Sequence, residues 1–162
     1  LFRCAVFNVF EIEREVLTID NHVLIKHVLS DIRDSYILNR VFQEFEPQVV
    51  LHAAAYKHVP MQEAFPWEAV KTNVLGTSNM VNVSLEHDVE KFVLVSTDKA
   101  VKPVNVMGAT KRLAELIIQG ANRANGTDFM AVRFGKLLGS SGSRSEERRV
   151  GQECKSKWSP YH

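Results

Sequence analysis

The 162-residue sequence has few of the features that mark several common protein classes. Its two cysteines, Cys4 and Cys154, have the spacing of neither a metal site nor a disulfide framework, so we interpret them as ordinary thiols and expect no metal. No apolar run reaches the ~18 residues of a membrane-spanning helix, and no signal peptide is recognisable. A net charge of +1 argues against nucleic acid as a main partner. With 45% hydrophobic and 24% charged residues, the composition predicts a soluble, cytoplasmic globular protein.

The beginning of the chain also lacks two expected features. The sequence starts at Leu1, without methionine and within an apolar segment. No glycine-rich turn of the kind that binds a pyrophosphate at a helix N-terminus lies near it. We therefore expect a fragment that is truncated at both ends.

The composition changes at residue 144. Residues 144–162 contain four apolar, five basic and three acidic residues, and they show neither strand alternation nor an apolar helix face. This stretch resembles the translated product of a short-read sequencing adapter, and a native basic tail is the alternative. We therefore assign residues 1–143 to one partial domain, expect 144–162 to be poorly packed, and leave them out of the functional interpretation.

The remaining chain alternates between two kinds of segment. Apolar runs predict buried strands over 47–55, 90–98 and 127–135. Apolar residues spaced three or four apart predict helices over 35–46, 66–87 and 108–124. Strands that alternate with helices predict an α/β fold, a doubly wound parallel sheet of the Rossmann-like type with helices on both faces.

The stretch STDKAVKPVNVMGATK has the layout of a Ser–Tyr–Lys hydride-transfer site, from Ser96 to Lys111, with Met107 at the tyrosine position. Lys111 follows Met107 by one helical turn, so both lie on one helix face. A thioether cannot accept a proton, so other groups have to move it. Asp98 and Lys99, at the end of a predicted strand, supply a carboxyl and an amine for acid–base chemistry. A solvated pair in a turn is the alternative.

Four motifs in order carry a resemblance to a known family: HAAAYKHVP, KTNVLGT, FVLVSTDKAVKPVNVMGATKRLAE and AVRFGKLLGSSGS. They resemble the nucleoside-diphosphate-sugar 4,6-dehydratases of the extended short-chain dehydrogenase/reductase superfamily. The similar branch acts on UDP-sugars such as UDP-N-acetylglucosamine in bacterial capsule and O-antigen biosynthesis. The resemblance covers about Phe7 to Ser143. Because that branch commonly has methionine at the tyrosine position, Met107 marks a subfamily and not a dead site.

The resemblance implies NAD or NADP as the cofactor, which would oxidise carbon 4 of the sugar. Lys99 would then remove the proton on carbon 5, and Asp98 would protonate the hydroxyl that leaves carbon 6. Ser96 and Thr97 would hold the 4-hydroxyl beside the cofactor, and Lys111 would hold the nicotinamide ribose. With methionine at the tyrosine position, either water or Asp98 would take the proton of the 4-hydroxyl.

The same resemblance implies further binding residues. Contacts with the cofactor are expected from a polar turn, from small residues after a strand and from a helix: Asp31, Ile32, Ala53, Ala54, Ala55 and Asn73. Contacts with the sugar nucleotide are expected from Lys57 and His58. An ordinary turn, tight packing and solvated surface positions are the alternatives for these residues.

Three departures from the family pattern limit what the resemblance implies. Arg3 stands where an acidic residue usually binds the cofactor ribose, which leaves NAD or NADP open. Lys136 replaces an asparagine expected near the substrate, and both the glycine-rich turn and the C-terminal substrate lobe are missing. We therefore expect the full-length product to be the dehydratase, a homo-oligomer that is attached to the cytoplasmic face of a membrane if it has a leader, and the fragment to be inactive. A related epimerase, which should keep the tyrosine, and a non-catalytic cofactor-binding protein are the alternatives.

Overall fold

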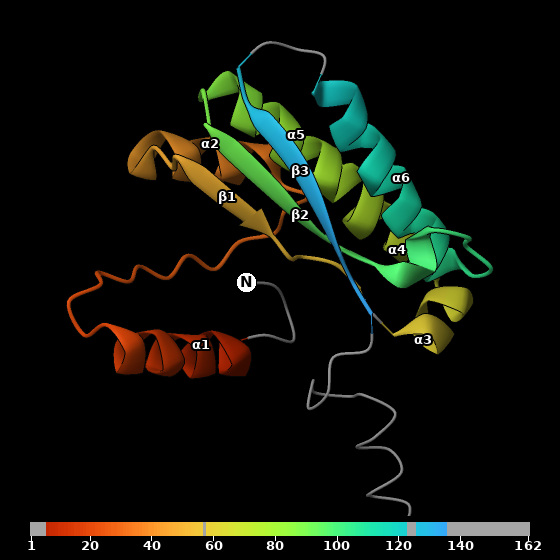
Figure 1. The fold of residues 1–162 in the computed structure, drawn as a ribbon, viewed down its shortest axis with the longest axis horizontal. Coiled ribbons are helices and arrows are strands. Elements are labelled where there is room, and N and C mark those ends of the chain that lie inside the picture. The colour runs from red at the N-terminus through yellow and green to blue at the C-terminus, as the bar shows by residue number, and fades with distance from the viewer. Residues whose placement is uncertain (1–5, 57, 123–125, 136–162) are drawn as a thin grey trace, which may run out of the picture.

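The computed structural model describes residues 6–56, 58–122 and 126–135. Its centre is a three-stranded parallel sheet in the order β1-β2-β3 (Figure 1). The strands are β1 (Val49–His52), β2 (Lys91–Thr97) and β3 (Asp128–Phe134). Each lies inside one of the three strand ranges expected from the sequence, and the parallel α/β class is confirmed. The expectations for the tail, 144–162, and for Arg3, Lys57 and Lys136 lie outside the described residues.

Two helices precede the sheet, and the others occupy the connections between its strands. They are α1 (Val6–Ile19), α2 (Ser35–Phe45), α3 (Val59–Ala64), α4 (Pro66–Ala69), α5 (Gly76–Glu86) and α6 (Val106–Ala121). A π-helical segment, Val70–Leu75, joins α4 to α5, so the single helix expected over 66–87 is interrupted by wider turns. Neither α1 nor α3 was expected, and the six residues of α3 are too few to show a helical period. Among the described residues, no helix has the length and apolarity needed to cross a membrane.

The apolar core lies between the sheet and the helices. Phe92 and Leu94 of β2 are completely buried there, together with Ala114 and Ile118 of α6. The Phe92 ring lies 5.3 Å from that of Phe129 in β3, centroid to centroid. Burying one such side chain contributes roughly 1.5–3 kcal/mol, so this layer fixes α6 over β2 and β3.

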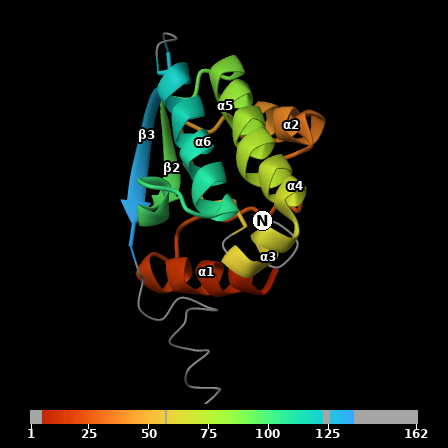
Figure 2. The ribbon, with the colours of Figure 1, turned by 90° about the vertical axis from the view of Figure 1, so that its right-hand side faces the viewer.

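Helices cover only one face of the described sheet. Both crossovers step in the same direction along the sheet, and right-handed crossovers that do so place α5 and α6 on the same side (Figure 2). The other face carries exposed apolar side chains, namely Val49, Leu51, Met130, Val132 and Phe134. The expectation of helices on both faces is therefore not met by the described residues. Helices on the second face would require further strands on the far side of β1, and the described residues contain none.

Candidate active site at the end of β2

Asp98 and Lys99 belong to a short 3-10 turn, Asp98–Ala100, that follows β2 directly. The Thr97 hydroxyl donates to Asp98 Oδ1 over 3.0 Å and accepts the Lys99 backbone N–H over 3.4 Å. Lys99 Nζ lies 3.3 Å from Asp98 Oδ1, and both side chains are about half exposed. Hydrogen bonds from Thr97 and then Lys99 hold the pKa of Asp98 below its usual range. The resting pair is therefore a carboxylate beside an ammonium, open to solvent.

The first turn of α6 lies against this turn. Asn105 caps the helix by accepting the Gly108 N–H over 2.8 Å, and Glu63 of α3 accepts the Val106 N–H over 2.6 Å. A Cβ atom at Gly108 would fall 2.5 Å from the Lys99 carbonyl oxygen. Glycine at this position thus permits a direct contact between the backbone of the Asp98–Ala100 turn and that of α6.

Met107 and Lys111 lie on the buried side of α6, one turn apart. The Lys111 ammonium donates to the carbonyl oxygen of Val95 in β2 over 2.8 Å, and only 8% of the residue is exposed. Burial lowers the pKa of Lys111 to about 8, and the charge of Glu115 acts in the opposite direction. The structure thus gathers Asp98, Lys99, Met107 and Lys111 where β2 ends and α6 begins, with Lys111 beneath the strand.

Ser96 is placed differently from what the sequence analysis expected. Successive side chains of a strand alternate between its faces, so Ser96 faces the helices and Thr97 faces away from them. The Ser96 hydroxyl is buried and donates to Glu115 Oε1 over 2.7 Å, which leaves Thr97 as the hydroxyl beside Asp98 and Lys99. Ser96 is therefore engaged by α6, where a contact with the 4-hydroxyl of a sugar had been expected.

Asn73 lies in the π-helical segment and is 1% exposed, so it is not a solvated helix position. Its Oδ1 accepts the Tyr56 N–H over 2.9 Å, and its Nδ2 donates to Gln62 Oε1 and Thr110 Oγ1, each over 3.0 Å. Gln62 also donates to the Tyr56 carbonyl over 2.8 Å. This network ties the loop after β1 to α3 and α6. The sequence analysis missed Gln62 and Thr110, whose only signal is that they are polar residues near expected site positions.

The loop after β1 is the other expected contact region. Ala53 is exposed, whereas Ala54 and Ala55 are half-buried, and Ala54 packs against the apolar core. His58 is exposed at the start of α3. These placements are compatible with the expected binding roles.

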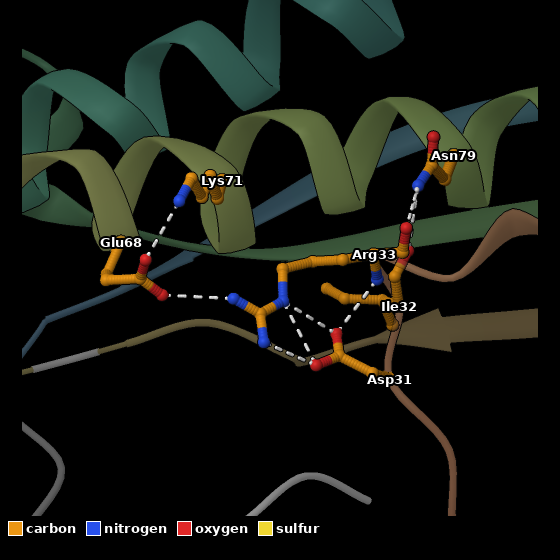
Figure 3. Close-up of polar contacts among 6 residues, drawn as sticks. All are labelled: Asp31, Ile32, Arg33, Glu68, Lys71 and Asn79. Atoms are coloured by element: carbon orange, nitrogen blue, oxygen red, sulfur yellow. Dashed lines mark hydrogen bonds and ion pairs between the residues drawn. The ribbon is translucent and has the colours of Figure 1, made fainter.

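The polar turn that contains Asp31 and Ile32 is fixed by two sets of contacts (Figure 3). Arg33 Nε donates to both carboxylate oxygens of Asp31 over 3.0 Å, and another Arg33 nitrogen donates to Glu68 over 3.0 Å. The Ile32 side chain is buried, and its carbonyl accepts from Asn79 over 3.1 Å. A cofactor could therefore reach the partly exposed Asp31 carboxylate, whereas Ile32 is almost wholly buried.

Glu115 of α6 is a second residue that the sequence analysis missed. It is 1% exposed and accepts hydrogen bonds from Ser96, Arg112 and Arg133. These bonds, led by that of Arg133, hold the pKa of Glu115 down at about 2. A single glutamate in a helix gives no local signal for such a role, because two of its three partners come from β2 and β3.

Two other kinds of site can be placed against this geometry. A groove of about 370 Å³ lies between α6 and β3, lined by residues such as Ile118, Gln119 and Ala131. It contains none of the residues expected at the site, which lie at the carboxyl ends of the strands. Among the described residues, no three His, Cys, Asp or Glu side chains gather in a way that could hold a metal ion.

Comparison with known proteins identifies the family. Residues 1–145 match the family described as polysaccharide biosynthesis protein. The chain belongs to this family. It is 48% identical over 138 residues to the capsular polysaccharide biosynthesis protein CapD of Staphylococcus aureus, covering 84% of this chain and 23% of CapD. It is 37% identical over 132 residues to a UDP-N-acetylglucosamine 4,6-dehydratase (inverting) of Campylobacter jejuni, covering 80% of this chain and 39% of that enzyme.

Members of related groups resemble this chain as well. A UDP-glucose 4-epimerase of Rickettsia typhi is 37% identical over 126 residues, covering 76% of this chain and 36% of the epimerase. The X-ray structure of Pen from Bacillus thuringiensis matches with a TM-score of 0.76 and 34% identity over 90% of this chain and 46% of Pen. A dTDP-4-dehydrorhamnose reductase from Bacillus anthracis in complex with NADP matches with a TM-score of 0.63 and 25% identity, over 76% of this chain and 48% of the reductase. The fold is thus Rossmann-like, and the chain spans less than two fifths of the length of these three curated relatives.

Proposed function

We propose that the whole protein carrying this chain is an NAD(P)-dependent nucleoside-diphosphate-sugar 4,6-dehydratase, a lyase of polysaccharide or glycan biosynthesis. Its substrate would be a UDP-N-acetylhexosamine, and it would act in the cytoplasm as a homo-oligomer. The observation that carries this proposal is the Thr97–Asp98–Lys99 turn in contact with the first turn of α6. The 162 residues alone should not turn over substrate, because the relatives named as such dehydratases are more than twice as long.

The described residues fit part of a nicotinamide dinucleotide. Three alanines with small side chains follow β1, the first of them exposed, and the Asp31 carboxylate is partly exposed in the turn that precedes α2. Lys111 adds a buried cation beneath the end of β2. When bound, the cofactor would supply hydride chemistry, namely oxidation at carbon 4 of the sugar and, after the elimination, return of the hydride to carbon 6.

Asp98 and Lys99 would carry the elimination as a pair. As an amine, Lys99 would take the carbon-5 proton, while a protonated Asp98 would give its proton to the hydroxyl leaving carbon 6. The C5–H and C6–O bonds break, a C5–C6 double bond forms, and water departs. The resting pair has the opposite protonation, and a proton that crossed the 3.3 Å between Nζ and Oδ1 would correct it. A substrate that covered the half-exposed pair would favour this neutral form, because burial disfavours charge.

Met107 and Lys111 would transfer no proton in this reaction. Met107 is buried in the first turn of α6, so it would contribute by packing. Lys111 is already bound to the Val95 carbonyl, so it would act as a fixed cation at the strand end. The proton of the 4-hydroxyl would then pass to Asp98 or to water, with Thr97 as the hydroxyl nearest to the pair.

The test uses a full-length protein in which this chain replaces the matching segment of the C. jejuni dehydratase. Supplied with UDP-N-acetylglucosamine and NAD+ or NADP+, it should form a 4-keto-6-deoxy product, with deuterium from D₂O at carbon 5. Lys99→Met and Asp98→Asn should each lower kcat by about a hundred- to ten-thousand-fold. Met107→Ala should cost far less. A severe loss at Met107 beside an unaffected Lys99→Met variant would refute these roles.

An epimerase is the second candidate, because relatives named UDP-glucose 4-epimerase share 36–37% identity with this chain. The product distinguishes the two reactions, since an epimerase leaves the 6-hydroxyl intact and inverts carbon 4. In an epimerase no hydroxyl leaves carbon 6, so Asp98→Asn should not slow the reaction by removing an acid at that position. Binding of the cofactor without any change in the sugar would instead indicate a non-catalytic cofactor-binding protein.

A further inference from the structure

Glu115 connects the three elements that frame the candidate site. Its Oε1 accepts from Ser96 of β2 over 2.7 Å and from Arg133 Nε of β3 over 2.8 Å. Its Oε2 accepts from Arg133 over 2.8 Å and from Arg112 of α6 over 2.9 Å. Hydrogen bonds between a carboxylate and a guanidinium are about twice as strong as neutral ones, and the paired bonds to Arg133 fix the angle as well as the distance.

Both ends of this network adjoin groups of the proposed reaction. Ser96 directly precedes Thr97, Asp98 and Lys99, and Glu115 follows Lys111 by one turn on the same buried helix side. We infer that Glu115, acting through Ser96, is a positioning residue that sets the place of the Asp98–Lys99 turn relative to Lys111. This inference rests on the proposed function.

The charges around Lys111 give a direct readout of the Glu115 carboxylate. The charge of Glu115 acts on it from α6, and His52 of β1 interacts with it from the sheet side. Arg112 of α6 and Arg133 of β3 bind Glu115. Burial lowers the pKa of Lys111, and the negative charge of Glu115 opposes that effect. Replacing Glu115 by glutamine keeps an acceptor for Ser96 but removes the charge, so the pKa of Lys111 should fall further.

The first experiment measures the titration of Lys111 in the 162-residue chain by competitive amine labelling and mass spectrometry across pH. Glu115→Gln should lower the titration midpoint, whereas Ser96→Ala should leave it in place because the carboxylate stays. The control Glu86→Gln removes a carboxylate that contacts Asn39 near the end of α5, and it should change nothing. An unchanged midpoint in a Glu115→Gln chain with the circular dichroism of the wild type would overturn the inference.

The second experiment measures kcat and KM in the full-length protein described above. A misplacement of about 1 Å can cost roughly a hundred-fold in rate, so we expect Ser96→Ala and Glu115→Gln to lower kcat about ten- to hundred-fold. KM should change by less than about three-fold, since the ground-state contacts with substrate remain. The double variant should be no slower than Glu115→Gln alone, because both changes break one linkage.

Multiplicative losses in the double variant would assign Ser96 its own contact with the substrate and overturn the inference. A rise confined to KM would do the same. A wild-type protein that forms no dehydrated sugar would refute the proposed function, and the titration of Lys111 would still decide whether Glu115 controls its surroundings.

Discussion

Gly108 offers a direct test of the contact between α6 and the Asp98–Ala100 turn. Gly108→Ala places a Cβ atom 2.5 Å from the Lys99 carbonyl oxygen, and the atom it meets belongs to the backbone. Ordinary contact begins at 3.4 Å, so the Lys99 backbone has to withdraw by about 0.9 Å, or α6 has to shift by as much. Either movement separates Asp98 and Lys99 from the helix that carries Lys111.

The expected energy follows from two opposed effects. Overpacking of a rigid contact costs about 1–3 kcal/mol, whereas alanine in place of glycine within a helix contributes up to about 1 kcal/mol of stability. We expect a net loss of about 1–2 kcal/mol for Gly108→Ala. In a chain of this size, each kcal/mol corresponds to roughly 2–4 °C in Tm.

Gly120 provides the matched control, because it lies in the same helix and a Cβ atom there meets nothing within 4 Å. Gly120→Ala should therefore be neutral or stabilising by up to about 1 kcal/mol. Urea and thermal unfolding of the two variants and the wild type measure the difference. If Gly108→Ala proves as stable as Gly120→Ala, the contact between Lys99 and α6 is wrong, and the placement of the Asp98–Ala100 turn is wrong as well.

Two further predictions concern buried titratable groups. Burial lowers the pKa of Lys111 from 10.5 to about 8, which corresponds to about 3 kcal/mol against the charged form at pH 7. Lys111→Met removes this cost but also loses the bond to the Val95 carbonyl, so the free energy of unfolding in urea should rise by a net amount on the order of 1 kcal/mol. A variant less stable than the wild type would contradict the burial of this charge. Burial lowers the pKa of His52 from 6.5 to about 3, so between these two pH values only the unfolded chain binds a proton at this imidazole. The free energy of unfolding should therefore decrease as the pH is lowered from 6.5 toward 3, by up to about 1.4 kcal/mol per pH unit. His52→Gln, which keeps an amide donor for Thr77, should flatten that dependence, and parallel curves for the two proteins would refute it.

The strands were predictable because a strand buried in a parallel sheet reads as an apolar run. Phe92 and Leu94 belong to such a run, and β2 lies within the range expected for it. The direction of winding was not predictable, since it depends on which strands become neighbours. Leu51, which looks like a core residue in the sequence, is 73% exposed because the described helices lie on the other face.

The candidate site was predictable in part. Polar residues that follow an apolar run mark a strand end, which located Asp98 and Lys99. The orientation of Ser96 could also have been derived, because it shares strand parity with Phe92 and Leu94, which face the core. The Glu115 and Asn73 networks could not, since all their side-chain partners except Arg112 lie 11 or more residues away in the chain and only the fold brings them together.

Helix α6 emerges as the common reference for the site. Thr110 accepts a hydrogen bond from Asn73, and Gly108 lies against the carbonyl of Lys99. Glu115 accepts hydrogen bonds from Ser96 near the end of β2 and from Arg133 near the end of β3. All three contacts are made on the helix side of the sheet, and the exposed apolar face takes no part in them. The relative placement of Lys99 and Lys111 is therefore set by α6 and the strand ends, independently of what covers the opposite face. A methionine at position 107 is compatible with this framework, because no contact described here requires a hydroxyl at that position.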